Sequence, residues 1–224
     1  MPYDIILRHV EQVTPDTRKL TFSKPDGFTF TPGQATDMAV LREGWENEQR
    51  PFTMTSFPDD DHLEFVIKSY PDHNGVTEQI GALQVGEHVR ITDPWGAIKD
   101  KGNGVFFAGG TGITPFIPIL RQRAREGTLK GCTLVLAAKT EDGLILKDEW
   151  DAMTDLDTVY VLSDENKHPF DHGRICLEVA NEFVAGHGEG THMFYICGPS
   201  GMVSNVKDNL TFMRVAPERI VTEG

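Results

Sequence analysis

The stretch Ala108-Gly109-Gly110-Thr111-Gly112-Ile113-Thr114-Pro115 decides the fold of the second half of this chain. It follows the apolar run Val105-Phe106-Phe107 and leads into a segment with helical periodicity. A strand that turns through glycines into a helix presents free backbone N–H groups, which suit a phosphate. The lysine and hydroxyl of a nucleotide-hydrolase loop are missing, so the pattern favours dinucleotide binding over phosphoryl transfer. A glycine loop alone is also consistent with an ordinary turn.

Beyond this loop, strand and helix patterns alternate to the end of the chain, which is typical of a doubly wound parallel sheet. We expect strands at 105–108, 133–138, 158–162, 193–197 and 219–222. We expect helices at 114–125, 147–153, 175–183 and 201–212. The sequence therefore predicts a five-stranded α/β domain over residues 103–224.

The first half of the chain has short strand patterns separated by turn signals. Leu63, Phe65 and Ile67 alternate with other residues and share one face of an expected strand. Many short strands with frequent turns favour an antiparallel barrel or sandwich, which we place at residues 1–98. A short helix is expected near 77–82, and the polar segment 99–104 is the expected linker.

The charge balance limits the class of partner. A formal net charge of −13 opposes binding to nucleic acid or to an anionic membrane. Arg121, Arg123, Arg125 and Lys130 are clustered, and we expect them to form a solvated helix face rather than a basic binding patch. No run of 18 apolar residues is present, so no membrane span is expected.

The cysteines and the amino-terminal residues indicate the cellular compartment of the protein. Cys132, Cys176 and Cys197 are far apart and odd in number, so they predict neither a disulfide framework nor an iron–sulfur cluster. The first residues lack the basic and apolar regions of a secretory signal. We therefore expect a cytoplasmic protein with reduced thiols. It is expected to be a monomer, because no heptad pattern or long exposed apolar segment is visible.

The segment Arg50-Pro51-Phe52-Thr53-Met54-Thr55-Ser56 combines an arginine, an aromatic ring and three hydroxyls. A guanidinium pairs well with a diphosphate, and an aromatic ring can stack on a flat cofactor ring. A hydroxyl can bond a ring nitrogen. The alternative is an ordinary strand with an exposed arginine.

Two further short stretches are candidates for ligand contacts. Thr77 can cap a short helix and leave free N–H groups for a second phosphate, or it can be a plain cap. Cys197-Gly198-Pro199 follows an apolar run, and ligands of open α/β sheets bind at the carboxyl ends of strands. That rule places Cys197 near the Gly109–Gly112 loop. The alternative is a small buried residue at a strand end.

Together these stretches resemble, in order and spacing, the ferredoxin–NADP⁺ reductase-like flavoenzymes, particularly the compact bacterial flavodoxin/ferredoxin reductase type. Arg50-Pro51-Phe52-Thr53 is similar to the family's flavin motif R-x-Y-[ST], and Gly75-Val76-Thr77 is similar to its pyrophosphate motif. The glycine loop, the Cys-Gly-Pro motif and Val221-Thr222-Glu223 resemble the remaining family segments. The resemblance covers almost the whole chain.

The resemblance implies an FAD-binding β-barrel followed by an NAD(P)-binding domain, with the two cofactors meeting at a cleft. It implies that Arg50 holds the FAD pyrophosphate, that Phe52 packs on the flavin, and that Cys197 lies beside nicotinamide C4. It implies Thr53, Cys197 and Glu223 as catalytic residues. The cofactor-binding residues that it implies are Arg50, Pro51, Phe52, Thr53, Ile67, Lys68, Tyr70, Gly75, Val76, Thr77, Gly110, Thr111, Gly112, Thr114, Ser163, Asp164, Cys197, Gly198 and Pro199.

Three departures from the family pattern affect the flavin site. Phe52 replaces the usual tyrosine, which keeps the ring but loses a hydroxyl, and Thr53 replaces the commoner serine, which keeps the donor. The sequence stops at Gly224, where many relatives continue to an aromatic residue that covers the flavin. We expect either an open flavin face or a cover from another group.

The choice between NADH and NADPH depends on Ser163-Asp164, where relatives that prefer NADPH often have Ser-Arg. A carboxylate about 4 Å from a 2′-phosphate costs roughly 1–4 kcal/mol, which slightly favours NADH. Lys139, Lys167 or Arg174 can offset this cost. The alternative is a solvated turn that touches no ligand.

The function implied by the resemblance is hydride transfer from nicotinamide C4 to flavin N5, followed by electron transfer to a protein or small acceptor. Ferredoxin or flavodoxin is the acceptor expected at the family level, although acidic carriers usually prefer a basic docking face. Ferric complexes, free flavins and quinones are rival acceptors. The alternative function is a flavin-binding electron-transfer or redox-sensing subunit without independent turnover.

Overall fold

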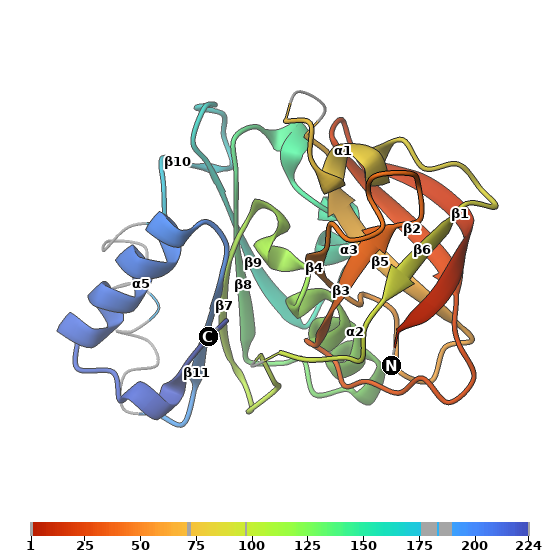
Figure 1. The fold of residues 1–224 in the computed structure, drawn as a ribbon. Helices are drawn as coiled ribbons and strands as arrows, with labels where there is room; N and C mark the ends of the chain where they lie inside the picture. Colours follow the sequence, from red (N-terminus) through yellow and green to blue (C-terminus); the bar gives the residue numbers. More distant parts are fainter. Residues whose placement is uncertain (1, 71–72, 97, 176–182, 184–189, 224) are drawn as a thin grey trace.

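The computed structural model describes residues 2–70, 73–96, 98–175, 183 and 190–223. These residues form two halves, each built on one six-stranded sheet (Figure 1). The first sheet is antiparallel and the second is parallel, so the predicted fold class is confirmed. Among the described residues, no helix combines the length and the apolar character that a bilayer crossing requires.

The antiparallel sheet contains β1 (Tyr3–Thr14), β2 (Thr17–Ser23), β3 (Ala35–Val40), β4 (Arg50–Thr53), β5 (His62–Lys68) and β6 (His88–Ile91), in the order β4-β3-β6-β1-β2-β5. Just beyond β4, the Thr55 N–H donates to the Glu64 carbonyl in β5 at 2.7 Å. The two outer strands of the sheet therefore approach each other.

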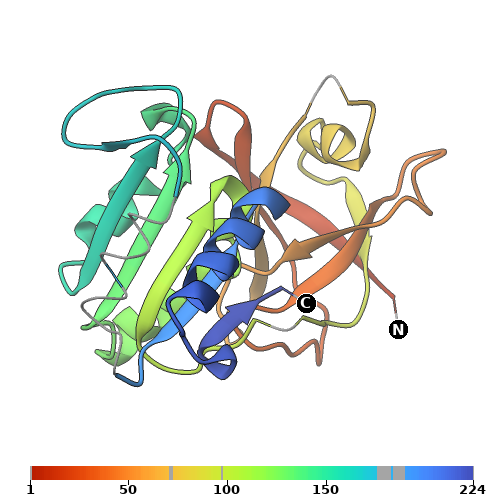
Figure 2. The ribbon, with the colours of Figure 1, turned by 90° about the vertical axis from the view of Figure 1, so that its left-hand side faces the viewer.

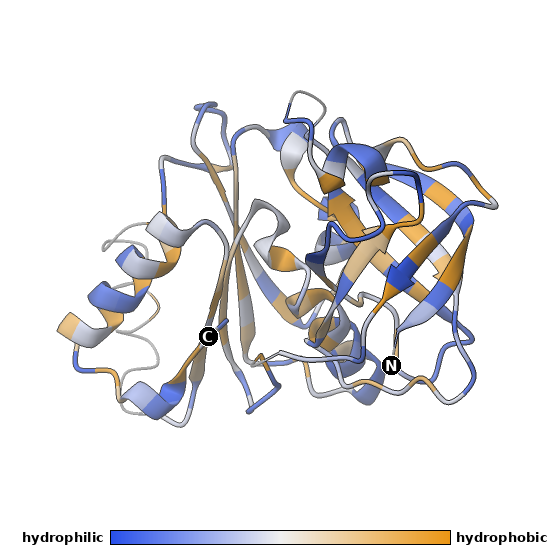
Figure 3. Cartoon of the chain, viewed as in Figure 1, coloured by the Kyte–Doolittle hydropathy of each residue, from blue (hydrophilic) through white to orange (hydrophobic). Residues whose placement is uncertain are grey.

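The core of this half follows the alternation read from the sequence. Leu63, Phe65 and Ile67 of β5 are all buried in one cluster, and Phe65 meets Phe22 edge-to-face at 5.9 Å. The short helix α1 (Val76–Gly81) covers this cluster with Val76 and Ile80. Figure 3 shows apolar residues along the strands of this half, interspersed with polar ones.

The parallel sheet contains β7 (Gly104–Gly109), β8 (Cys132–Ala138), β9 (Leu156–Leu162), β10 (Asp171–His172), β11 (Met193–Cys197) and β12 (Ile220–Thr222), in the order β10-β9-β8-β7-β11-β12. All five expected strands are present. The sixth strand, β10, was missed because two residues are too short to show a period.

Helices cover both faces of this sheet. They are α2 (Phe116–Glu126), α3 (Lys147–Ala152) and α5 (Ser200–Phe212). Phe106 of β7 packs in one cluster with α2 and α3, whereas its neighbour Phe107 packs in another with α5. Successive strand residues face opposite sides, so an unbroken apolar run supplies both layers. Figure 2 shows α5 lying across its face of the sheet. The expected helix 175–183 falls mostly outside the described residues.

The arginines of α2 correct one expectation. Arg123 is buried, and its Nε and Nη2 donate to Asp100 at 2.8 and 2.6 Å. Arg121 is also largely buried, with 17% of its side chain exposed. The prediction of a solvated helix face is wrong for these two residues and holds for the exposed Arg125, whereas Lys130 is exposed but lies beyond the end of α2. Helical periodicity cannot reveal partners that come from distant segments.

Candidate cofactor-binding cleft

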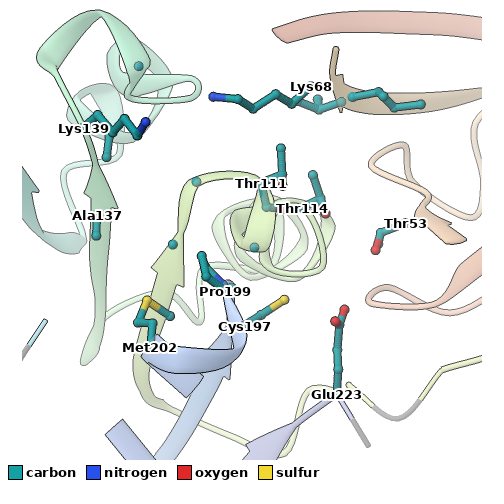
Figure 4. Close-up of a pocket in the computed structure, with 18 of the residues that line it drawn as sticks. Thr53, Lys68, Thr111, Thr114, Ala137, Lys139, Cys197, Pro199, Met202 and Glu223 are labelled. Carbon is teal, nitrogen blue, oxygen red and sulfur yellow. Dashed lines mark hydrogen bonds between the residues drawn. The ribbon is translucent and has the colours of Figure 1, made fainter. Parts of the chain in front are cut away.

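A large cavity of about 1620 Å³ is lined by both halves of the molecule (Figure 4). Its volume exceeds the roughly 300–1,000 Å³ that is usual for one small ligand, so it has room for two cofactors. The antiparallel half contributes, among others, Gly33, Ala35, Pro51, Phe52, Thr53, Ile67, Lys68, Tyr70, Thr77 and Trp95. The parallel half contributes, among others, Gly109, Gly110, Thr111, Gly112, Thr114, Lys139, Ser163, Asp164, Arg174, Cys197, Gly198, Pro199, Met202 and Glu223.

The cavity opens where the strand order of the parallel sheet reverses. β7 lies between β8 and β11, and Ala108 pairs with Cys197 at the carboxyl ends of their strands. Connections from β7 and β11 leave the sheet toward opposite faces, which opens the crevice where α/β proteins bind ligands. A 3₁₀ turn, Gly110–Ile113, follows β7 and leads into α2. The strand–glycine–helix prediction is therefore confirmed.

Glycine is needed at two positions of this turn, for a different structural reason at each. A Cβ on Gly112 would lie 2.2 Å from the Cys197 carbonyl oxygen, so a side chain there would push the turn off β11. Gly110 has φ +53°, a left-handed conformation that most side chains disfavour. These positions keep backbone, rather than side chains, at the wall of the cavity.

Three polar groups from separate segments meet in the cleft. Figure 4 shows the Thr53 hydroxyl, the Cys197 sulfur and the Glu223 carboxylate directed into the same space. Thr53 and Cys197 are 8% and 5% exposed. Burial raises the pKa of the Cys197 thiol far above its ordinary value, and the nearby Glu223 carboxylate raises it further. Cys197 therefore remains a neutral thiol at physiological pH.

The side of the cavity formed by the antiparallel half is apolar and aromatic with a charged rim. Phe52, Ile67 and Tyr70 line it, and the Lys68 ammonium lies 5.8 Å from the centroid of the Tyr70 ring. Lys68 also pairs with Asp16 at 2.5 Å. Flat apolar surface beside a hydrogen-bond donor fits an isoalloxazine ring, which is apolar on its faces and polar at one edge.

Three residues expected at the site do not line the cavity. The Arg50 side chain is 56% exposed, donates to the Gln49 carbonyl at 2.6 Å and lies 3.9 Å from Glu48. Val76 is buried in the apolar core of its half. Gly75 is the N-cap of α1, and no side chain makes a capping hydrogen bond. The expectation that Thr77 caps this helix is therefore wrong, although Thr77 does line the cavity.

The far end of the cavity carries the charges considered for nucleotide choice. Ser163 and Asp164 line it, and the Ser163 hydroxyl donates to Asp164 Oδ1 at 2.7 Å. Lys139 and Arg174 also line the cavity. Lys167 forms an ion pair with Glu141 instead. Asp164 therefore shares this end with two cations rather than three.

The sequence did not single out several residues of the cavity wall. Asp16 and Met202 come from a β-turn and from the first turn of α5. Trp95 is 46% exposed, and its Nε1 donates to Asp37 at 3.2 Å. The sequence signal that marks Trp95 is the turn-forming run Asp93-Pro94-Trp95-Gly96, where the strand patterns of the first half end. Within the described ranges, no group of three His, Cys, Asp or Glu side chains is arranged to hold a metal ion.

Comparison with known proteins agrees with this division. The oxidoreductase FAD-binding domain model matches residues 4–99, and the oxidoreductase NAD-binding domain model matches residues 106–208. The chain is 30% identical to an NADH-cytochrome b5 reductase 1 of Candida glabrata, over 92% of this chain and 79% of that protein. It is 32% identical to the reductase component of a propane 2-monooxygenase of Rhodococcus jostii, over 87% of this chain but only 55% of that longer protein.

A solved structure shares the fold. A ferredoxin NADP⁺ reductase from Neisseria gonorrhoeae, crystallised with FAD and NADP, superposes with a TM-score of 0.84 at 20% identity. The superposition covers 99% of this chain and 98% of that one. Two domain models in sequence, a relative matched over most of its length and a shared two-domain fold lead to one conclusion. The chain belongs to the ferredoxin–NADP⁺ reductase-like family of FAD- and NAD(P)-binding oxidoreductases.

Proposed function

We propose that this chain transfers a hydride from NAD(P)H to bound FAD and then passes electrons to a redox protein. The observation that carries the proposal is the convergence of Thr53, Cys197 and Glu223 from both halves in one cavity. Bound FAD supplies an acceptor for a two-electron hydride and a donor of single electrons. The chain supplies the alignment of the two cofactors and excludes water from the space between them.

The proposed residue roles follow from where each group lies. Phe52 packs against the flavin ring, Thr53 donates to its polar edge, and backbone around Ile67, Lys68 and Tyr70 borders it. The turn containing Gly110, Thr111, Gly112 and Thr114 receives the dinucleotide.

Some of the proposed roles belong to residues that do not line the cavity themselves. Arg50 is adjacent to the lining residue Pro51, so its long side chain needs to swing inward to reach a pyrophosphate. Gly75 and Val76 contribute backbone N–H groups beside Thr77. Gly198 and Pro199 hold Cys197 at the nicotinamide. We propose 1–98 and 103–224 as the bounds of the two domains.

The proposed acceptor is a redox protein, because the relatives named above are a cytochrome b5 reductase and the reductase component of a monooxygenase. Ferredoxin and flavodoxin remain the specific acceptors that we propose to test first. A panel of ferredoxin, flavodoxin, cytochrome b5, ferric citrate, free flavin and a quinone, each followed anaerobically, identifies the acceptor. We also propose a cytoplasmic monomer.

The proposed activity is tested by the colour of the protein. Reconstitution with FAD should give a yellow protein whose visible band disappears on anaerobic addition of NADH or NADPH. A stable yellow protein that ignores both nucleotides would support the alternative, a redox-sensing or electron-transfer subunit without turnover. A protein that binds no FAD would remove both functions.

Nucleotide choice gives a separate prediction. We expect Asp164→Arg to raise the preference for NADPH over NADH by roughly 10-fold, since a carboxylate near a phosphate is replaced by a cation. The measurement is the ratio of kcat/KM for NADPH to kcat/KM for NADH. Lys167→Gln is the matched control, because Lys167 is engaged by Glu141 and should leave the ratio unchanged. An unchanged ratio in Asp164→Arg would show that Asp164 does not face the ribose.

A further inference from the structure

The guanidinium of Arg121 forms hydrogen bonds that join the two halves of the molecule. Arg121, on α2, donates from Nη1 to the Thr55 carbonyl at 3.0 Å and to Glu64 Oε1 at 2.8 Å, both in the antiparallel half. The same side chain donates from Nε and Nη2 to the two carboxylate oxygens of Glu149 on α3, at 2.6 and 2.9 Å. A single residue thus contacts both halves through four hydrogen bonds.

The two carboxylates around Arg121 keep its guanidinium charged despite burial. Burial of Arg121 opposes its charged form, but the hydrogen bonds with Glu149 and the charges of Glu64 and Glu149 outweigh burial and raise the pKa of Arg121 above its ordinary value. The planar fork of arginine suits the two carboxylates in a way that a lysine ammonium cannot reproduce. The Thr55 hydroxyl also donates to Glu64 Oε1 at 2.8 Å, so the buried carboxylate is well satisfied.

The two partners of Arg121 in the antiparallel half lie close in sequence to residues of the cavity wall. Thr55 lies two residues beyond Thr53, and Glu64 lies in β5, the strand that carries Ile67. Arg121 lies on α2, which is joined to the Gly110–Ile113 turn by Thr114 and Pro115. Arg121 is not itself among the residues that line the cavity. It can therefore influence the cleft only through the segments that it holds.

A second contact between the halves is weaker. Arg125, one turn along α2, pairs with Asp59 at 3.1 Å, and both side chains are largely exposed. Exposed pairs of this kind contribute little to stability because water and salt screen them. Arg125 also lies over the Phe57 ring at 4.4 Å. Arg125 offers a matched control on the same helix.

We propose that Arg121 is a positioning residue that sets the spacing between the flavin-binding wall and the nicotinamide-binding turn. The inference rests on the proposed function, because hydride transfer requires the two reacting rings to be held in close and correct alignment. The carbonyl of Thr55 and the carboxylate of Glu64 fix one wall. The carboxylate of Glu149 accepts from Nε and Nη2 of Arg121, which leaves Nη1 directed at the Thr55 carbonyl and the Glu64 carboxylate.

The test compares Arg121→Gln, Arg121→Lys and Arg125→Gln. In anaerobic stopped-flow experiments, Arg121→Gln should lower the rate of flavin bleaching at saturating NADH by roughly 10- to 100-fold, as expected for a small misplacement of reacting groups. The Kd for NAD⁺ and the FAD content should change little. Arg121→Lys should restore part of the rate, and Arg125→Gln should match the wild type. Should Arg121→Gln fail to fold, the double variant Arg121→Gln/Glu64→Gln, which removes the more deeply buried of the two carboxylates that lose their partner, is used instead.

A second readout needs no cofactor. Calorimetry of the FAD-free protein should show one cooperative unfolding transition for the wild type and a split or broadened transition for Arg121→Gln, because the buried hydrogen bonds that Arg121 makes between the two halves are lost. A wild-type rate in Arg121→Gln, or an equal loss in Arg125→Gln, overturns the proposal. Absence of bleaching in the wild type contradicts the proposed function instead, and the calorimetric comparison then decides whether Arg121 couples the halves.

Discussion

Replacing Gly112 with alanine should nearly abolish reduction of the flavin by NADH while leaving FAD bound. The added Cβ would lie 2.2 Å from the Cys197 carbonyl oxygen and 2.6 Å from the Gly198 Cα. Both are backbone atoms near the end of a central strand, so neither can move aside as a flexible side chain would. The turn must therefore shift away from β11, and the proposed dinucleotide site shifts with it.

The expected size of the Gly112→Ala effect is a fall of about 100-fold in the rate of anaerobic bleaching, the scale that a displacement of about 1 Å produces at a reacting centre. The FAD spectrum before mixing should be unchanged, because the turn belongs to the other half. Gly201→Ala is the control for stability, since a Cβ at Gly201 meets no atom within 4 Å. Its melting temperature should stay at the wild-type value or rise. A wild-type bleaching rate in Gly112→Ala would remove this turn from the nucleotide site.

Replacing Cys197 with alanine should slow hydride transfer by roughly 10- to 100-fold without loss of FAD. The Cys197 thiol is buried, points into the cleft and lies beside Glu223. Alanine removes the sulfur that lies beside Glu223, so the nicotinamide ring should be less tightly held. The loss should appear in the rate at saturating NADH more than in the nucleotide Kd.

The raised pKa of Cys197 predicts how the rate of flavin bleaching depends on pH. Burial and the Glu223 carboxylate raise the pKa of the thiol, so it stays protonated below that raised value. Between about pH 6 and 9 the bleaching rate should show no step from ionisation of Cys197. Cys132→Ala is the matched control, because Cys132 is a second buried free thiol of the same sheet, outside the cavity wall. Equal rates in Cys197→Ala and Cys132→Ala would place Cys197 outside the reaction.

Much of the fold could be predicted from local pattern. The glycine turn after β7 and the alternating elements of the second half follow from spacing that the backbone must obey. β10 escaped prediction because two residues carry no period, and Thr77 was misjudged as a cap because the N-cap of α1 is Gly75, two residues earlier. Errors of one or two residues at the ends of helices are usual, because helix ends are weakly defined by local sequence.

The cleft could be predicted only in part, because its wall is assembled from distant segments. Cys197 could be placed beside the glycine turn, since strand ends meet at one edge of a parallel sheet. Arg121 could not be understood from sequence. Its partners Glu64 and Glu149 lie 57 and 28 residues away, and only the packing of two halves brings them together. The same holds for Trp95 and Asp37, which are 58 residues apart.

The most direct test of the central claim, that both rings meet in one cleft, is anaerobic stopped-flow reduction of the FAD-loaded protein by NADH deuterated at the transferred C4 position. We predict that the yellow band disappears with both ordinary and deuterated NADH. The loss should be slower with deuterated NADH, because the C4 hydrogen moves directly to the flavin. A fully FAD-loaded protein that keeps its yellow band with both NADH and NADPH would contradict it.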